Sequence, residues 1–245
     1  MFLAAVARPR FDSFGNGIFV GKIGIWPILE QKPAQRNNKY RKAGTLETKP
    51  IDPINQKVSM CFMINKVIPA IRAKWPTGNT RTIYIQQDNA KPHIGKHDKE
   101  FKEAASIDGF NMQLICQPPN SPDMNTLDLE FFVGIQSLQH RVAPEDIDEL
   151  ISAVESAFNN MSARTLNRVF LSHQLCMREV LKCRGGIDYD LQHIGKQSLD
   201  RNGKLPLQIA VEKHLIHDVL VERNMLSEFW SSLGSGVLSS SENPM

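Results

Sequence analysis

The sequence has few cysteines, no long apolar run and no strong excess of charge, and each shortage excludes a class of protein. Its four cysteines form no Cys-x-x-Cys pair, so it predicts neither a disulfide framework nor a structural zinc site. This sparse usage is typical of a reduced compartment, and we expect an intracellular protein. No apolar run approaches the roughly 18 residues that cross a bilayer, so we expect no membrane-spanning segment.

The charge balance is mildly basic, because lysine and arginine exceed aspartate and glutamate by 29 − 26 = 3. Apolar residues make up 41% of the chain, and its 15 glycines bring that share near the level of about 45–50% found in globular proteins. A wholly disordered chain is therefore excluded. At about 150 residues per domain, the 245 residues predict between one and two domains.

The first seven residues are apolar, but no basic residue precedes them and Arg8 follows at once. A secretory signal carries its positive charge before the apolar run, so we do not expect one. The run predicts a buried strand instead. A chain that begins inside a core strand leads us to expect that an upstream segment is missing.

Apolar spacing predicts an α/β sheet followed by a helical tail. We expect strands at residues 1–7, 18–20, 22–29, 82–87 and 112–116. We expect helices at 58–75 (kinked or broken at Pro69), 97–106, 125–138, 144–158, 165–183 and 207–229, and disorder at 234–245.

The segment from Glu30 to Lys49 has few apolar residues and an excess of cations. One interpretation is a solvated loop. The other is a loop that contacts DNA phosphates, since such contacts come chiefly from lysine and arginine. The candidate DNA-binding residues are Lys32, Arg36, Lys39, Arg41 and Lys42.

Two aspartates are candidates for chemistry. Asp88 directly follows a predicted strand, and Asp128 lies in the first turn of a predicted helix. Carboxylates in these positions can converge above a sheet edge, where Mg²⁺ finds oxygen ligands. The spacing alone leaves open a purely structural role for both, because aspartates are common in turns and helix caps.

The residues around these aspartates resemble a known signature. Ile85-Gln-Gln-Asp88-Asn-Ala-Lys-Pro-His93, followed by Gln117-Pro-Pro-Asn-Ser-Pro-Asp-Met-Asn-Thr-Leu-Asp128, resembles the catalytic signature of Tc1/mariner transposases. The separation, 128 − 88 = 40 with 39 residues between, resembles the plant mariner-like branch. The resemblance covers about residues 1–195 and includes the stretches 1–12, 21–24, 43–50 and 135–139.

The resemblance implies a ribonuclease-H-like fold, a mixed sheet flanked by helices. Three carboxylates there hold two Mg²⁺ or Mn²⁺ ions for DNA cleavage and strand transfer. By motif, Asp88 is the second carboxylate and Asp128 the third, with Asn89 and His93 shaping the site. Asp123 has the spacing of another mariner branch, with 34 residues between it and Asp88. In that branch, however, the catalytic aspartate is the later one of the motif, so the motif selects Asp128.

The resemblance also implies segments that this sequence lacks. The first catalytic aspartate lies on a strand upstream of the stretch that matches residues 1–12, and Asp12 is a poor substitute because it lies in a turn. The helix-turn-helix region that reads transposon ends has no counterpart either. The first strand is central in the sheet, so its loss would leave two half-sheets without their usual partner. We therefore expect an N-terminally truncated fragment that is inactive or very weak.

The expected domains are a catalytic core at 1–143, a helical extension at 144–195, a helical tail at 196–233 and a disordered tail at 234–245. The resemblance implies DNA as a partner, a homodimer and action in the nucleus, with no membrane and no small-molecule cofactor. Two alternatives remain: a DNA- or partner-binding protein that keeps the fold without chemistry, and a chain that does not fold stably. Zinc is not expected at His93 and His97, because the glutamate of His-Glu-x-x-His is absent.

Overall fold

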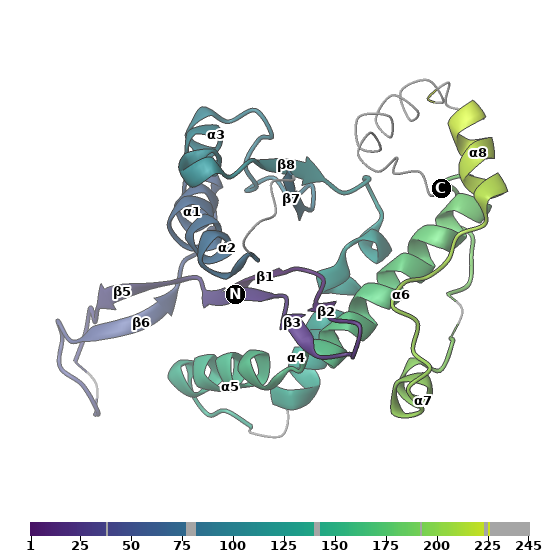
Figure 1. Cartoon of the computed structure of the whole chain (residues 1–245). Coiled ribbons are helices and arrows are strands. Elements are labelled where there is room, and N and C mark those ends of the chain that lie inside the picture. Colours follow the sequence, from purple (N-terminus) through teal and green to yellow (C-terminus); the bar gives the residue numbers. More distant parts are fainter. Residues whose placement is uncertain (38, 77–81, 140–142, 192, 223–224, 226–245) are drawn as a thin grey trace. The chain divides into compact units, whose positions relative to one another are not determined.

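The computed structural model describes residues 1–37, 39–76, 82–139, 143–191, 193–222 and 225 (Figure 1). The chain divides into two compact units, residues 1–170 and 171–245. Helices and strands both contribute, so the predicted α/β class is confirmed. No helix among the described residues is long and apolar enough to span a membrane.

The first unit is built on an antiparallel pair of strands, β1 (Phe2–Val6) and β4 (Lys22–Pro27). Neighbouring residues of a strand point to opposite faces, and both faces of this pair are covered. Ile23 joins a cluster with α1 (Gln56–Phe62), a π-helical stretch (Met63–Val67) and α2 (Ile68–Lys74). Ala4 and Ile25 join a second cluster with α4 (Phe132–Gln139), α5 (Ile147–Asn160) and the start of α6 (Ala163–Lys182).

The predicted helix over 58–75 is thus present and is interrupted by the π-helical stretch just before Pro69. Pro69 lies in the first turn of α2, directly after the π-helical stretch that interrupts the helix.

The second strand pair is parallel and carries the predicted strands β7 (Ile83–Gln87) and β8 (Met112–Cys116). They are joined by α3 (Lys99–Ala105), which begins at Asp98, whose carboxylate accepts the Phe101 N–H. Ile83, Met112 and Leu114 are buried in the same cluster that covers β1–β4. The opposite face is open, since Tyr84 is 61% exposed.

The single mixed sheet expected from the sequence does not form among the described residues. Their strands make four two-stranded sheets: β1–β4, β2 (Arg10–Phe11) with β3 (Gly17–Phe19), β5 (Leu29–Pro33) with β6 (Leu46–Pro50), and β7–β8. The pairs β1–β4 and β7–β8 share one helical layer and one hydrophobic cluster. No described strand joins them by hydrogen bonds, so β1 and β7 each keep one open edge.

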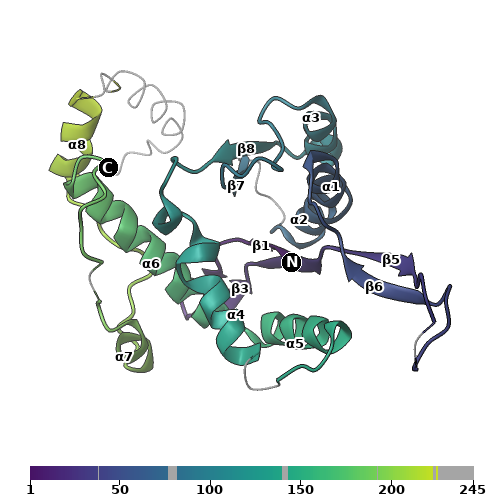
Figure 2. The same cartoon turned by 180° about the vertical axis from the view of Figure 1, so that it is seen from behind.

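The solvated loop considered for 30–49 is wrong in part, because β5 and β6 form an antiparallel hairpin there. The hairpin projects from the rest of the first unit (Figures 1 and 2). Its strands carry polar residues on both faces, so no apolar alternation marks them. Lys32 lies 2.5 Å from Glu30, and Lys49 lies 3.1 Å from Glu47.

In the second unit, the last part of α6 packs through Leu171, Leu175 and Cys176, all nearly or fully buried. The Tyr189 hydroxyl lies 3.2 Å from the Cys176 sulfur, and the Gln174 side chain accepts the Ile209 N–H at 2.9 Å. Two short helices follow, α7 (Lys196–Arg201) and α8 (Lys213–Glu222).

The helix predicted over 207–229 begins only at Lys213, and the prediction is wrong for residues 207–212, which are not helical. Residues 223–224 and 226–229 of that helix, and the disordered tail predicted at 234–245, lie outside the described residues.

Candidate functional site

Asp88 lies where the chain leaves β7 and turns. Its Oδ1 accepts the Ala90 N–H at 2.9 Å and lies 2.7 Å from Nδ1 of His93. The loop is anchored by Ile94, which is 3% exposed and whose carbonyl accepts a 2.7 Å hydrogen bond from the Gln87 side chain. The carboxylate itself stays accessible, with the Asp88 side chain 39% exposed.

Asp128 lies in a π-helical segment, Leu127–Phe131, at the start of the helix that continues as α4. Its Oδ2 accepts a 2.8 Å hydrogen bond from the Asn125 side-chain amide, and Oδ1 of Asn125 accepts the Leu127 N–H. Asn125, just before this segment, thus accepts one of the backbone N–H groups of its first turn. Asp128 is exposed, while Phe131 beneath it is 0% exposed and fixes the segment to the core.

Two hydrogen bonds tie together the segments that carry these aspartates. The Asn89 side-chain amide donates to the Gln117 carbonyl at 2.8 Å, and the Gln86 side-chain amide donates to the Met124 carbonyl at 2.7 Å. β7 and β8 are parallel, so the chain leaves both strands at the same edge. The two loops therefore lie side by side, with Asp88 in one and Asp128 after the other.

The structure thus gives Asn89 and His93 definite local roles. Asn89 joins the loops after β7 and β8, whereas His93 holds the Asp88 carboxylate directly. The sequence motif pointed to both residues but gave no partner for either one.

The residues present do not form a closed metal centre. Among the described residues, no three His, Cys, Asp or Glu side chains lie close enough to hold an ion. Asp12, the poor substitute for a third carboxylate, is committed to its own turn. Its carboxylate accepts hydrogen bonds from the Phe14 N–H and from the N–H and side-chain amide of Asn16. The bonds from Asn16 are the main reason why the pKa of Asp12 is lowered.

The five candidate DNA-binding cations all lie on β5 or in the loop that joins β5 to β6, and two of them are neutralised locally. Lys32 pairs with Glu30 at 2.5 Å, and Arg41 pairs with Glu47 at 2.8 Å. Arg36, Lys39 and Lys42 are exposed, and Lys39 lies 5.5 Å from the Tyr40 ring centroid. Sequence reasoning missed these ion pairs because one joins two residues on the same face of β5 and the other joins the loop to β6.

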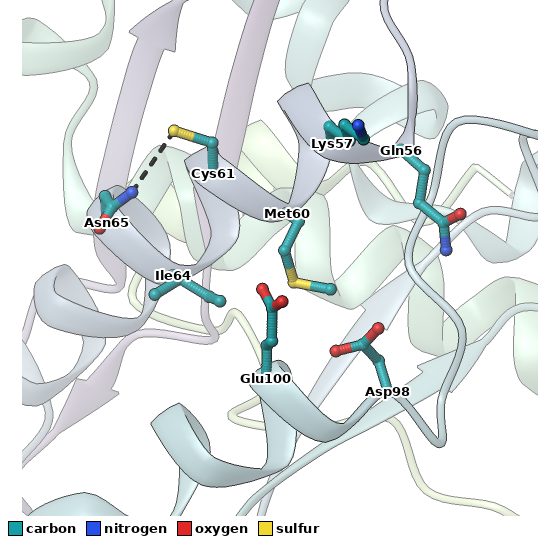
Figure 3. Close-up of a pocket in the computed structure, with 8 residues that line it drawn as sticks. All are labelled: Gln56, Lys57, Met60, Cys61, Ile64, Asn65, Asp98 and Glu100. Carbon is teal, nitrogen blue, oxygen red and sulfur yellow. Dashed lines mark hydrogen bonds between the residues drawn. The ribbon is translucent and has the colours of Figure 1, made fainter.

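A shallow hollow of about 570 Å³ lies between α1 and the start of α3 (Figure 3). Sequence reasoning gave no sign of it, because its lining comes from segments far apart in the chain. Neither Asp88 nor Asp128 lines it, so it is separate from the candidate catalytic residues. Its lining residues are Gln56, Lys57, Met60, Cys61, Ile64, Asn65, Asp98 and Glu100.

Comparison of the chain with protein-family models, curated proteins and solved structures finds no match.

Proposed function

We propose that this chain is part of the catalytic domain of a mariner-like DNA transposase, with Asp88 and Asp128 as two of its metal-binding carboxylates. The observation that carries the proposal is the pair of hydrogen bonds that hold the two motif-bearing loops together at one edge of β7–β8. The segments that carry Asp88 and Asp128 are thereby joined beside the carboxyl end of a parallel strand pair, where carboxylates suit Mg²⁺ or Mn²⁺.

The arrangement of strands supports a ribonuclease-H-like origin. In that fold a central strand lies between an antiparallel pair and a parallel pair. Here an antiparallel pair, β1–β4, and a parallel pair, β7–β8, share a helical layer, and each keeps an open edge. A strand placed between β1 and β7 would complete such a sheet and would carry the first carboxylate.

Two carboxylates bind a divalent ion more weakly than three, so we propose that the 245-residue chain binds Mg²⁺ weakly and cuts DNA slowly or not at all. By resemblance its partner is DNA, its assembly is a homodimer and its place of action is the nucleus. The exposed cations Arg36, Lys39 and Lys42 of the β5–β6 loop supply one surface for phosphate contacts.

A plasmid-nicking assay with Mg²⁺ or Mn²⁺ tests this proposal. We expect the 245-residue chain to convert little or no supercoiled plasmid, and a longer chain with an aspartate-bearing strand before Phe2 to cut it. Asp128→Asn should abolish cutting by the longer chain, whereas Asp123→Asn, the same chemical change five residues earlier, should not. The contrary result is that the 245-residue chain cuts DNA robustly and loses this activity in Asp128→Asn. That result would contradict the proposed slow or absent cutting, but it would leave the proposed transposase family standing.

The second candidate function is DNA or partner binding without chemistry. Two observations favour it: no group of three metal-ligating side chains occurs among the described residues, and the Asp88 carboxylate is already held by His93. This function predicts salt-dependent DNA affinity that Asp88→Asn leaves unchanged, and no cutting by the longer chain either.

A further inference from the structure

A basic surface, made of Arg10, Lys74 and the turn at residues 19–23, has no role in the function proposed above. Arg10 is exposed, and its guanidinium carbon lies 5.4 Å from the Trp75 ring centroid and 5.8 Å from that of Phe19. The two rings pack edge to face at 5.6 Å. The guanidinium is therefore held in place by two aromatic side chains.

Lys74, at the end of α2, lies on the same turn. Its ammonium donates to the Ile23 carbonyl at 2.7 Å and approaches the Lys22 carbonyl at 3.3 Å. Lys22 itself points to the end of α5, where it donates to the Asn159 carbonyl at 2.5 Å. Burial, and then the nearby Lys74 charge, lower the pKa of Lys22, and the second of these causes is the effect expected of neighbouring cations.

No carboxylate among the described residues forms an ion pair with Arg10, Lys22 or Lys74. Residues 53–87 contain no aspartate or glutamate, so α1, the π-helical stretch and α2 carry only positive charge. Asp12, the nearest acid along β2–β3, bonds to its own turn. This surface therefore differs from the β5–β6 hairpin, whose glutamates neutralise part of its charge.

We propose that this surface binds the phosphodiester backbone of duplex DNA, and the choice of DNA as the polyanion rests on the proposed function. The planar guanidinium of Arg10 presents paired N–H donors that match a phosphate, while Lys74 adds a point charge. Val20 at the same turn is 45% exposed, so an acidic, apolar protein segment is the competing occupant that the experiment must separate from DNA.

The test measures duplex affinity by fluorescence anisotropy between 50 and 200 mM salt for the full 245-residue chain. The double variant Arg10→Gln/Lys74→Gln should lower the slope of log K against log salt by about 1.8, since each phosphate contact contributes about 0.9. The matched control Lys204→Gln/Lys213→Gln removes the same charge from exposed sites of the second unit and should leave the slope unchanged.

Three outcomes overturn the inference. If both double variants lower the slope equally, only net charge matters. If Arg10→Gln/Lys74→Gln binds like the parent, DNA does not contact this surface, although the proposed function stands. If the parent binds polyglutamate but no duplex even at 50 mM salt, the occupant is acidic protein and the proposed function fails as well.

A second measurement needs no variant and so does not depend on its folding. Lysine acetylation followed by mass spectrometry should show Lys74 protected by duplex, and Lys204 unaffected. Equal labelling of Lys74 with and without duplex at saturating DNA would overturn the inference.

Discussion

Replacing Phe131 with alanine tests the packing that holds the segment bearing Asp128. The Phe131 ring is 0% exposed and lies 5.4 Å from the Phe132 centroid and 6.2 Å from that of Phe158. Removing a fully buried aromatic ring costs about 3–5 kcal/mol, from lost burial and from the cavity that remains. With an m value of about 2 kcal/mol/M, the urea midpoint should fall by about 1.5–2.5 M.

The assay is equilibrium unfolding followed by tryptophan fluorescence. In a Trp230→Phe background the signal comes from Trp26 and Trp75, both in the first unit. Val133→Ala is the control, because Val133 lies two residues away and is 61% exposed, so its loss should cost less than about 0.5 kcal/mol. A cost below about 1 kcal/mol for Phe131→Ala, or equal costs at both positions, would refute the packing described. If the alanine variant is unfolded without urea, Phe131→Leu gives a smaller change in the same direction.

Three further predictions concern the turn, the second unit and the hairpin. Gly21 has φ +81°, and an added Cβ would lie 2.1 Å from the Ala7 carbonyl oxygen. Gly15 has a similar φ of +84° but open surroundings, so Gly15→Ala should lower the unfolding free energy by roughly 1 kcal/mol. Gly21→Ala should lower it clearly more, and matched thermal unfolding of the two variants makes the comparison. Hydrogen bonds from Lys182, and then Arg178, lower the pKa of Glu179 below its ordinary 4.5. This carboxylate therefore stabilises the second unit above pH 4.5, and the stabilisation is lost as the pH falls through the lowered pKa. Unfolding midpoints measured from pH 7 to 3 should fall less steeply in Glu179→Gln than in the parent, and an unchanged pH profile would contradict this. Arg36→Gln/Lys39→Gln/Lys42→Gln should lower the DNA salt slope by up to about 2.7, whereas Lys32→Gln, whose charge Glu30 already balances, should change it little.

The local elements of the first unit were predictable because short-range patterns decide them. β7 and β8 are runs rich in apolar and β-branched residues that end at turn residues, and Asp98 is a strong cap at the start of α3. The β5–β6 hairpin was not predictable in this way. Its strands depend on pairing with each other and on ion pairs such as Arg41 with Glu47, and neither leaves an apolar alternation in the sequence.

Strand pairing between distant segments was the least accessible feature. The sequence gives the order of β1 and β7 along the chain, but which strand edges form hydrogen bonds depends on contacts between distant segments. The expected mixed sheet does not form among the described strands. The candidate site shows the same limit. Motif spacing selects Asp88 and Asp128, whereas the bonds that bring their loops together, from Asn89 and Gln86, join backbone carbonyls 28 and 38 residues away.

A metal site shared by Asp88 and Asp128 is tested most directly by Mn²⁺ binding, measured by electron paramagnetic resonance on five chains: the parent, Asp88→Asn, Asp128→Asn, the double variant and Asp123→Asn. If the two aspartates form one site, each single change weakens binding about tenfold or more, and the double variant is no weaker than the worse single variant, because the site is already lost. Asp123→Asn binds like the parent. Additive losses, or an equal loss in Asp123→Asn, would contradict a shared metal site at Asp88 and Asp128.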